Sequence, residues 1–193
     1  MIRYQKNPGR KSGTIEVDGK SYQAKYIGKG QYSKVFRVGD RVVYYTRGDC
    51  GKEVLAMFQY DRMVHLPELI RHENVPTVRG IWYVFSSPYY RNVTAKDKSA
   101  WELMKKVIEV VEYYRVYRKG YEGSYVMQET INNIKTHESY CGKLPNSIMK
   151  ALQEIVDVAS NCGDHVGFDL HTKNFGVNEY GTLIFRDPIY TRN

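Results

Sequence analysis

The sequence lacks long hydrophobic runs, and no window approaches the roughly 18 consecutive apolar residues that a membrane-spanning helix requires. No apolar stretch follows the first basic residues, so we expect no secretory signal. Cysteine is also scarce: Cys50, Cys141 and Cys162 lie far apart and form no C-x-x-C pair. An odd number of widely spaced cysteines indicates reduced thiols rather than a disulfide framework. These absences predict a cytoplasmic protein that does not act at a membrane.

Acidic residues are few in the first quarter of the chain. Residues 1–50 contain 11 basic and 4 acidic residues, a net charge of +7, whereas the rest of the chain adds only +1 to the total of +8. A basic surface can simply favour solubility, or it can attract nucleotide phosphates, nucleic acid or an acidic partner. Because the sequence contains no zinc-finger, RRM-like or helix-turn-helix pattern, we do not expect nucleic acid as a partner.

Turn signals divide the chain into a sheet followed by helices. Asp18-Gly19 and Gly39-Asp40 each separate two alternating segments, which predicts two hairpins within residues 14–46. The order of elements predicts an α+β fold with two lobes. The other expected elements are a helix over 52–65, strands over 75–86, a helix opened by a capping box at Ser99–Glu102, an irregular segment over 115–141, a helix over 146–161 and a hairpin over 175–186.

Two glycines lie in a loop between two predicted strands. Gly28, Gly30, Ser33 and Val35 follow the pattern G-x-G-x-x-[G/S]-x-V. A dinucleotide-binding loop would need a helix after the glycines, so that interpretation is excluded. A strand-loop-strand of this pattern is typical of the loop that covers phosphates in protein kinases, with the valine packing on adenine. The alternative is an ordinary hairpin turn.

Two aspartates and an asparagine form the second pattern. Asp169 and Asn174 match D-x-x-x-x-N, and Asp187 ends the second strand of the hairpin that follows. The hairpin can return Asp187 to the side of Asn174, where amide and carboxylate oxygens would suit Mg²⁺. Asp169 would then orient an attacking hydroxyl and accept its proton. Alternatively, these residues only stabilise a loop and a turn.

The motifs together resemble the protein-kinase-like superfamily, and more narrowly the small kinases encoded early by short-tailed lytic phages. The resemblance covers about residues 22–90 and 145–190. It is carried by Gly28–Ser33, Asn74–Pro76, Gly167–His171 and Ile184–Pro188. In such proteins D-P replaces D-F-G, and D-[hydrophobic]-H-x-x-N is the catalytic loop. Similar loops occur in small-molecule kinases of the aminoglycoside and choline type.

The resemblance implies a two-lobed, minimal protein-kinase-like fold. It divides the chain into a basic lead-in (1–13), an N-lobe of antiparallel sheet plus helix with the glycine loop and hinge (14–90), and a reduced, mostly helical C-lobe (91–193). It implies ATP and Mg²⁺ as cofactors and Ser or Thr of host proteins as acceptors in the host cytoplasm. It also implies catalytic roles for Asp169, Asn174 and Asp187, the last two as metal ligands.

The sequence departs from the family pattern in two places. Tyr44 stands where a strand lysine is expected, so Lys34 or Arg47 would have to bind phosphate, with Glu53 as the partner of that cation. The chain also ends six residues after Asp187, which leaves no expected peptide-docking platform. These departures keep two alternatives open: a pseudokinase that binds and inhibits a host protein, and a small-molecule kinase.

Two minor questions also remain open at this stage. The hinge is expected at Ser87–Tyr89, with Tyr125–Glu129 as the competing segment. The pairs His137/Cys141 and Cys162/His165 have spacings that occur in zinc sites, although scattered cysteines and histidines are more often packed or exposed. His171 is expected to brace its loop rather than to act as a ligand or base.

Overall fold

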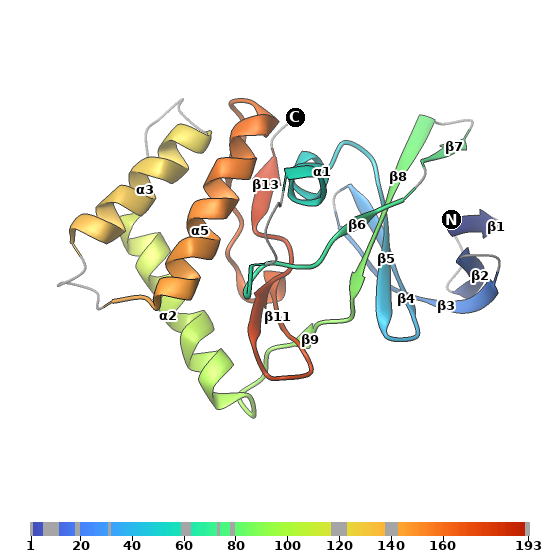
Figure 1. The fold of residues 1–193 in the computed structure, drawn as a ribbon, viewed down its shortest axis with the longest axis horizontal. Coiled ribbons are helices and arrows are strands. Elements are labelled where there is room, and N and C mark those ends of the chain that lie inside the picture. The colour runs from blue at the N-terminus through green and yellow to red at the C-terminus, as the bar shows by residue number, and fades with distance from the viewer. Residues whose placement is uncertain are drawn as a thin grey trace. The chain divides into compact units, whose positions relative to one another are not determined.

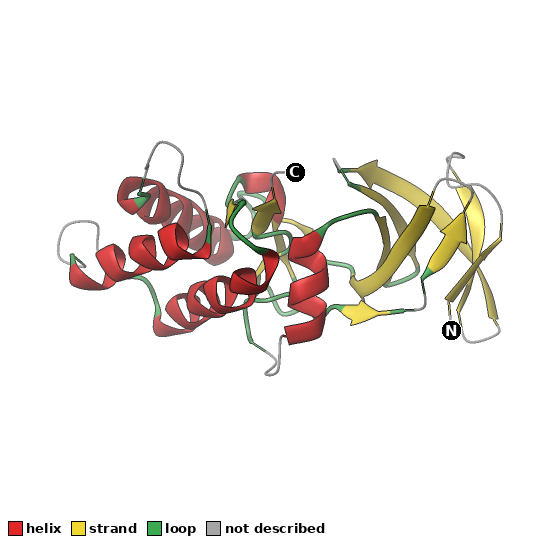
Figure 2. Cartoon of the chain, turned by 90° about the horizontal axis from the view of Figure 1, so that it is seen from above, coloured by secondary structure: helices red, strands yellow, loops and turns green. Residues whose placement is uncertain are grey.

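The computed structural model divides into two compact units. Unit 1 comprises Met1–Asp49 and Glu68–Tyr89, and unit 2 comprises Cys50–Pro67 and Tyr90–Asn193. Within the described residues, unit 1 contains strands, whereas unit 2 combines helices with short strands (Figure 2). The predicted α+β class, with an N-terminal antiparallel sheet and a mainly helical remainder, is confirmed. The structure describes residues 2–5, 12–17, 20–30, 32–58, 63–72, 74–77, 80–116, 123–137 and 143–191.

Unit 1 is built on an antiparallel sheet with the strand order β1-β2-β3-β4-β5-β8-β6, and β7 also pairs with β8 (Figure 1). Both predicted hairpins are present, although the turn residues Asp18 and Gly19 lie outside the described part. Gly39 has a φ of 61°, which glycine adopts without steric cost. The strands are β1 (Ile2–Gln5), β2 (Ser12–Val17), β3 (Lys20–Lys29), β4 (Ser33–Val38), β5 (Arg41–Thr46), β6 (Ile70–Arg71), β7 (Val75–Thr77) and β8 (Gly80–Pro88).

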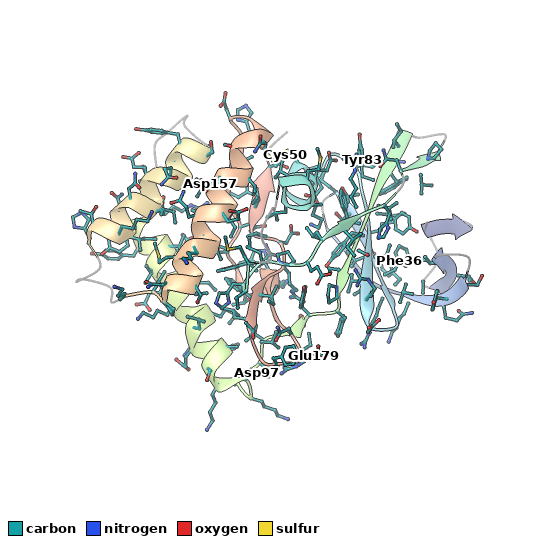
Figure 3. All side chains as sticks on the ribbon, in the orientation of Figure 1. Phe36, Cys50, Tyr83, Asp97, Asp157 and Glu179 are labelled. Carbon is teal, nitrogen blue, oxygen red and sulfur yellow. A yellow bond between two sulfur atoms is a disulfide. The ribbon has the colours of Figure 1, made fainter. Side chains whose placement is uncertain are left out.

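Alternation along the strands gives unit 1 one apolar face. Phe36 (Figure 3) packs edge-on against Tyr45 with ring centroids 5.7 Å apart, and both side chains are buried. Val43 and Val84 belong to the same cluster, and Trp82 packs against it. Burial of one large apolar side chain contributes roughly 1.5–3 kcal/mol, so this face holds the sheet together.

Among its described residues, unit 2 contains three longer helices, of which α3 contacts both α2 and α5 (Figure 1). Each buries a stripe of apolar residues, as expected for helices that share a core. Short strands form the sheets β12-β11-β9 and β10-β13. The elements are α1 (Cys50–Phe58), β9 (Arg91–Asn92), α2 (Lys98–Tyr114), α3 (Ser124–Thr136), α5 (Asn146–Ala159), the 3₁₀ turns η1 (Ser160–Cys162) and η2 (Thr172–Asn174), β10 (Val166–Phe168), β11 (Phe175–Val177), β12 (Leu183–Phe185) and β13 (Ile189–Thr191).

Three sequence-based predictions of helices need correction. The helix expected over 52–65 is already replaced by a turn at Val64 and His65. The segment 115–141 is not irregular throughout, because it contains α3. The capping box is also wrong: α2 begins one residue before Ser99, and its N-cap is Asp97, whose carboxylate is bound by other groups.

Helix α1 belongs with unit 2, although its residues fall within the N-lobe predicted over 14–90. It packs against α5 and β13, and its apolar residues Val54 and Leu55 are buried. A nine-residue helix is only marginally stable by itself, so these tertiary contacts decide where it lies. Within the described residues, no helix is both long and apolar enough to cross a bilayer.

A disulfide joins Cys50, at the start of α1, to Cys162, at the end of η1. The expectation that the thiols are reduced is therefore wrong for this pair. The sequence could not reveal the pairing because 112 residues separate the two cysteines, and only the packing of α1 beside η1 brings them together. The cross-link fixes the first turn of α1 within unit 2.

Reduction of this disulfide is expected to lower the free energy of unfolding by about 2–4 kcal/mol, because the cross-link restricts the unfolded chain. Denaturant unfolding of the wild type with and without a thiol reductant measures the difference. The matched control is the double variant Cys50→Ser/Cys162→Ser, whose curve should not respond to reductant. Coincident wild-type curves under the two conditions would contradict the expectation.

Candidate active site

Two antiparallel ladders bring the three predicted catalytic residues together in unit 2. Strand β10 pairs with β13, and just beyond this pairing the Asp169 amide donates to the Pro188 carbonyl at 2.8 Å. Strand β11 pairs with β12, and beyond it the Arg186 amide donates to the Asn174 carbonyl at 2.7 Å. Asp187 lies between Arg186 and Pro188, the two residues that bond to Asn174 and Asp169. The predicted return of Asp187 to the neighbourhood of Asn174 thus has a backbone basis.

Asp169 follows β10 in the loop, with about a third of its side chain exposed (35%). Its carboxylate Oδ1 lies 3.5 Å from His171 Nε2. His171 braces the loop as expected, because its Nδ1 accepts from the Lys173 amide at 3.2 Å. A partly exposed carboxylate on a braced loop can reach a group outside the chain, as a general base must.

Asn174 closes the same loop. Its side-chain Nδ2 donates to the main-chain carbonyl of Asp169 at 2.9 Å. This bond fixes the amide plane and directs its oxygen away from that carbonyl. An amide oxygen of this kind is a ligand that Mg²⁺ accepts.

The carboxylate of Asp187 pairs with a residue that sequence reasoning missed. Lys52, in the first turn of α1, places Nζ 2.8 Å from Asp187 Oδ1. The Lys52 side chain is 5% exposed, whereas that of Asp187 is 41% exposed. Lysine is almost never buried without a partner, so this carboxylate explains how the ammonium is tolerated there.

Tight packing on β13 sets the position of α1. A Cβ at Gly51 would meet both Cβ and the carbonyl oxygen of Ile189 at 3.0 Å, so glycine allows the helix to approach this strand. Gly51 lies between the disulfide at Cys50 and the ion pair at Lys52. All three consecutive residues therefore bind the start of α1 to unit 2.

Arg186 is a second residue that the motif did not identify. Its guanidinium donates to the Tyr90 carbonyl through Nη1 at 3.2 Å and to the Lys173 carbonyl through Nη2 at 2.5 Å. Gly176 makes room for it, because a Cβ there would lie 2.8 Å from the Arg186 and Tyr90 side chains. Arg186 thus connects the Asp169–Asn174 loop to the segment before β9, next to Asp187.

Strand β9 supports the β11–β12 hairpin at the other edge of β11. It pairs with β11, with Arg91 opposite Val177. Both guanidinium nitrogens of Arg91 bind the carboxylate of Asp97 (Figure 3), which also accepts from the amide and hydroxyl of Thr94. The hydrogen bonds from Arg91, then those from Thr94, hold the pKa of the Asp97 carboxyl well below its usual range.

Asp97→Asn is expected to destabilise the protein in a pH-dependent way. Because folding lowers this pKa, the ionised carboxyl stabilises the fold above its ordinary pKa of about 3.9, and the contribution disappears as the pH falls below that value. The melting temperature of the wild type should exceed that of the variant at pH 7, and the gap should narrow below about pH 4. A constant gap from pH 7 to pH 3 would contradict the assignment.

The glycine loop of unit 1 lies between β3 and β4. The Gly30 amide donates to the Ser33 carbonyl at 2.9 Å, and Ser33 Oγ donates to the buried Asp49 carboxylate at 3.1 Å. Neither Gly28 nor Gly30 has a positive φ. Among the described atoms, a Cβ would meet nothing within 4 Å at Gly28 and only Ser33 Cβ, at 4.0 Å, at Gly30. The chain's own packing therefore does not require glycine at these two positions.

Lys34 and Val35 are adjacent on β4 and face opposite sides of the sheet. Lys34 shares its face with Phe36, and its Nζ lies 5.6 Å from the centroid of the Trp82 ring. Val35 pairs in register with Tyr44, on the other face. One ligand on one face of the sheet therefore cannot use both Val35 for adenine and Lys34 for phosphate.

Tyr44 occupies the strand position where the family resemblance implies a lysine, and Arg47 is one of the two cations expected to replace that lysine. The Tyr44 hydroxyl lies 3.3 Å from Ser87 Oγ, within hydrogen-bonding distance. The Arg47 guanidinium lies 4.1 Å from the centroid of the Trp82 ring, on the same aromatic residue that Lys34 approaches. Glu53 follows Lys52 in α1 and is half-buried.

The two segments expected as hinges and the zinc pairs have these places in the structure. Tyr125–Glu129 lies inside α3, whereas Ser87 and Pro88 end β8. Ser87–Tyr89 therefore stays the predicted hinge. Cys162 is consumed by the disulfide, so it is not a zinc ligand beside His165. Cys141 lies outside the described residues.

The described part of the chain holds no group of three or more His, Cys, Asp or Glu side chains suited to a metal ion. Mg²⁺ needs fewer protein ligands, because it keeps several waters and is commonly bound by one or two carboxylates together with substrate phosphates. The amide oxygen of Asn174 and the partly exposed carboxylate of Asp187 fit that requirement. The donor set therefore suits Mg²⁺ that arrives with a phosphate compound.

Comparison with known proteins finds similarity to solved structures. No protein-family model matches the chain, and no curated protein matches it by sequence. The fold is similar to the crystal structure of a thermostable mutant of the aminoglycoside phosphotransferase APH(4)-Ia in its apo form, with a TM-score of 0.38 and 12% identity. The match covers 88% of this chain and 68% of that protein. At these values the functional conclusion depends on the geometry described above.

Proposed function

We propose that the protein is a phosphotransferase of the protein-kinase type that transfers the γ-phosphoryl group of ATP to a hydroxyl. The observation that carries the proposal is the convergence of Asp169, Asn174 and Asp187 through main-chain bonds of two ladders. This set supplies one base and two oxygen ligands, which are among the groups that the reaction needs from the protein.

Each residue of the cluster has a distinct role in the proposed reaction. Asp169 orients the acceptor hydroxyl and takes its proton, while His171 and the Asn174 amide hold the loop in place. Asn174 and Asp187 would hold Mg²⁺, which, when bound, offsets the negative charge of the phosphates. Because the transition state is loose, catalysis depends mainly on positioning, and the two ladders supply it.

The glycine loop of unit 1 would cover the phosphates. Gly28 and Gly30 lack side chains where the chain itself does not require glycine, so a ligand can approach the main chain closely at these positions. Val35 is the residue of this loop that would pack against adenine, whereas Ser33 acts by bracing the loop through Asp49. The excess of positive charge in residues 1–50 favours an anionic ligand.

We propose Ser and Thr of host proteins as acceptors, as the resemblance to the phage kinases implies. The test combines the protein with γ-labelled ATP, Mg²⁺ and a host lysate, followed by phosphoamino-acid analysis of labelled proteins. We expect label on phosphoserine and phosphothreonine, and none when EDTA removes Mg²⁺. Label in small metabolites but not in proteins would identify a small-molecule kinase instead.

A second candidate function is a pseudokinase that binds and inhibits a host protein. The bond between Tyr44 and Ser87 favours it, because it leaves the usual strand position without a phosphate-binding lysine. Binding of ATP without any transfer would support this candidate. Absence of both ATP binding and transfer would overturn the proposed phosphotransferase activity.

A further inference from the structure

The phosphates of a bound nucleotide need a cation that the strand position does not supply. Lys34 and Arg47, the two candidates from the sequence, both approach the ring of Trp82. Trp82 packs against the apolar cluster of unit 1, and Lys34 shares that face, opposite Val35. Neither residue therefore suits a ligand that Val35 contacts.

Lys52 is a third cation, and it lies in unit 2 with the proposed metal ligands Asn174 and Asp187. Its ammonium contacts the carboxylate of Asp187, the proposed metal ligand, at 2.8 Å. The Lys52 side chain is 5% exposed and that of Asp187 is 41% exposed, so the ion pair joins a buried ammonium to a carboxylate that solvent reaches. Burial strengthens the interaction of an ammonium with any anion that enters, because water screens it less.

Helix α1, which carries Lys52, is attached to the rest of unit 2 at the two residues that precede this lysine. The disulfide fixes Cys50, and the close approach to Ile189 fixes Gly51. Ile189 is two residues beyond Asp187, so the helix is attached next to its ion-pair partner. A preorganised cation loses less conformational entropy when it binds a ligand.

We propose that Lys52 is the phosphate-binding cation of this protein, moved from the strand position of Tyr44 to the first turn of α1. Without nucleotide it neutralises Asp187. With nucleotide its ammonium donates to phosphate oxygens, and the Asp187 carboxylate is left for the metal. The inference rests on the proposed function, since it names the residue that contacts the phosphates in the same site.

The test measures binding of ATP, ADP and adenosine by calorimetry, in EDTA so that metal does not contribute. Lys52→Met should weaken ATP and ADP by about 10- to 100-fold, the range for loss of a charged hydrogen bond, and leave adenosine within about 2-fold. Lys150→Met, which removes an exposed lysine of α5, is the matched control and should bind all three like the wild type.

A second comparison separates direct contact with phosphate from an effect transmitted through Asp187. In the Asp187→Asn background the ion pair is already lost, so the double variant Lys52→Met/Asp187→Asn tests Lys52 alone. We expect a further loss of about 10-fold in ATP affinity between these two variants, with adenosine unchanged. Equal ATP affinities would show that Lys52 serves only to hold Asp187 and would overturn the inference.

The outcomes also separate the inference from the proposed function. Wild-type protein that binds no nucleotide overturns both. Wild-type protein that binds ATP, combined with a loss on Lys34→Met or Arg47→Met and none on Lys52→Met, overturns the role of Lys52 and leaves the proposed function intact. Circular dichroism of each variant confirms that a loss of binding is measured on folded protein.

Discussion

Asp169→Asn is expected to lower the rate of phosphoryl transfer by about 100- to 10,000-fold, the range for removal of a general base. Asparagine has nearly the same shape and keeps the main-chain bonds to Pro188 and from the Asn174 side chain. The substitution therefore removes proton-accepting ability and leaves the loop in place. Initial rates at saturating ATP and Mg²⁺ measure the effect.

The same variant should bind ATP within about 2-fold of the wild type, because Asp169 is proposed to contact the acceptor and not the phosphates. Asp157→Asn is the matched control, since it changes an exposed aspartate of α5 in the same unit. A rate within 10-fold of wild type for Asp169→Asn would remove Asp169 from the role of base. A parallel loss of ATP affinity would assign it to the nucleotide instead.

Local signals in the sequence predicted the sheet and the final hairpin well. Gly39-Asp40 forces the chain to turn between β4 and β5, so neighbouring residues alone determine that hairpin. Helix α3 was missed even though Met127, Ile131 and Ile134 have helical spacing. Its N-cap, Gly123, makes no side-chain capping bond, and polar residues separate the apolar ones, so the helix depends on burial against α2 and α5.

The candidate site shows the same difference between features set by neighbouring residues and features set by contacts distant in sequence. The spacing of Asp169, Asn174 and Asp187 is local enough to predict, because one hairpin and one loop connect them. Lys52 was missed because nothing in its surrounding sequence indicates burial or a partner at position 187. Its place depends on α1 packing in unit 2, which the disulfide and Gly51 determine through contacts distant in sequence.

Asp187→Asn is expected to reduce phosphoryl transfer at least about 100-fold, since loss of even an outer-sphere partner of a metal costs 10- to 100-fold. It should also lower the free energy of unfolding by about 1–3 kcal/mol, because Lys52 is then a buried cation without its carboxylate. The partial exposure of Asp187 places the expected loss below that of a fully buried pair. Initial rates and denaturant unfolding measure the two effects separately.

The double variant Lys52→Met/Asp187→Asn separates the two proposed roles of the Asp187 carboxylate, which are to bind the metal and to neutralise Lys52. Removal of both charges leaves no unpaired ion, so the double variant should be more stable than the sum of the single losses predicts, by about 1 kcal/mol or more. Its transfer activity should stay lost, because the metal ligand is still absent. Recovery of stability without recovery of activity is the result that a purely structural ion pair would not give.

The exposed pair Glu102–Lys105 on α2 provides the matched double-mutant cycle. Its side chains are 68% and 50% exposed and lie 2.9 Å apart, so the contact distance is similar but the environment is water. The coupling energy of Glu102→Gln with Lys105→Met should be at most about 0.5 kcal/mol. If the Lys52–Asp187 cycle gave no larger coupling than this surface pair, burial would not strengthen the interaction. That result would also contradict the proposal that Lys52 is a preorganised phosphate-binding cation.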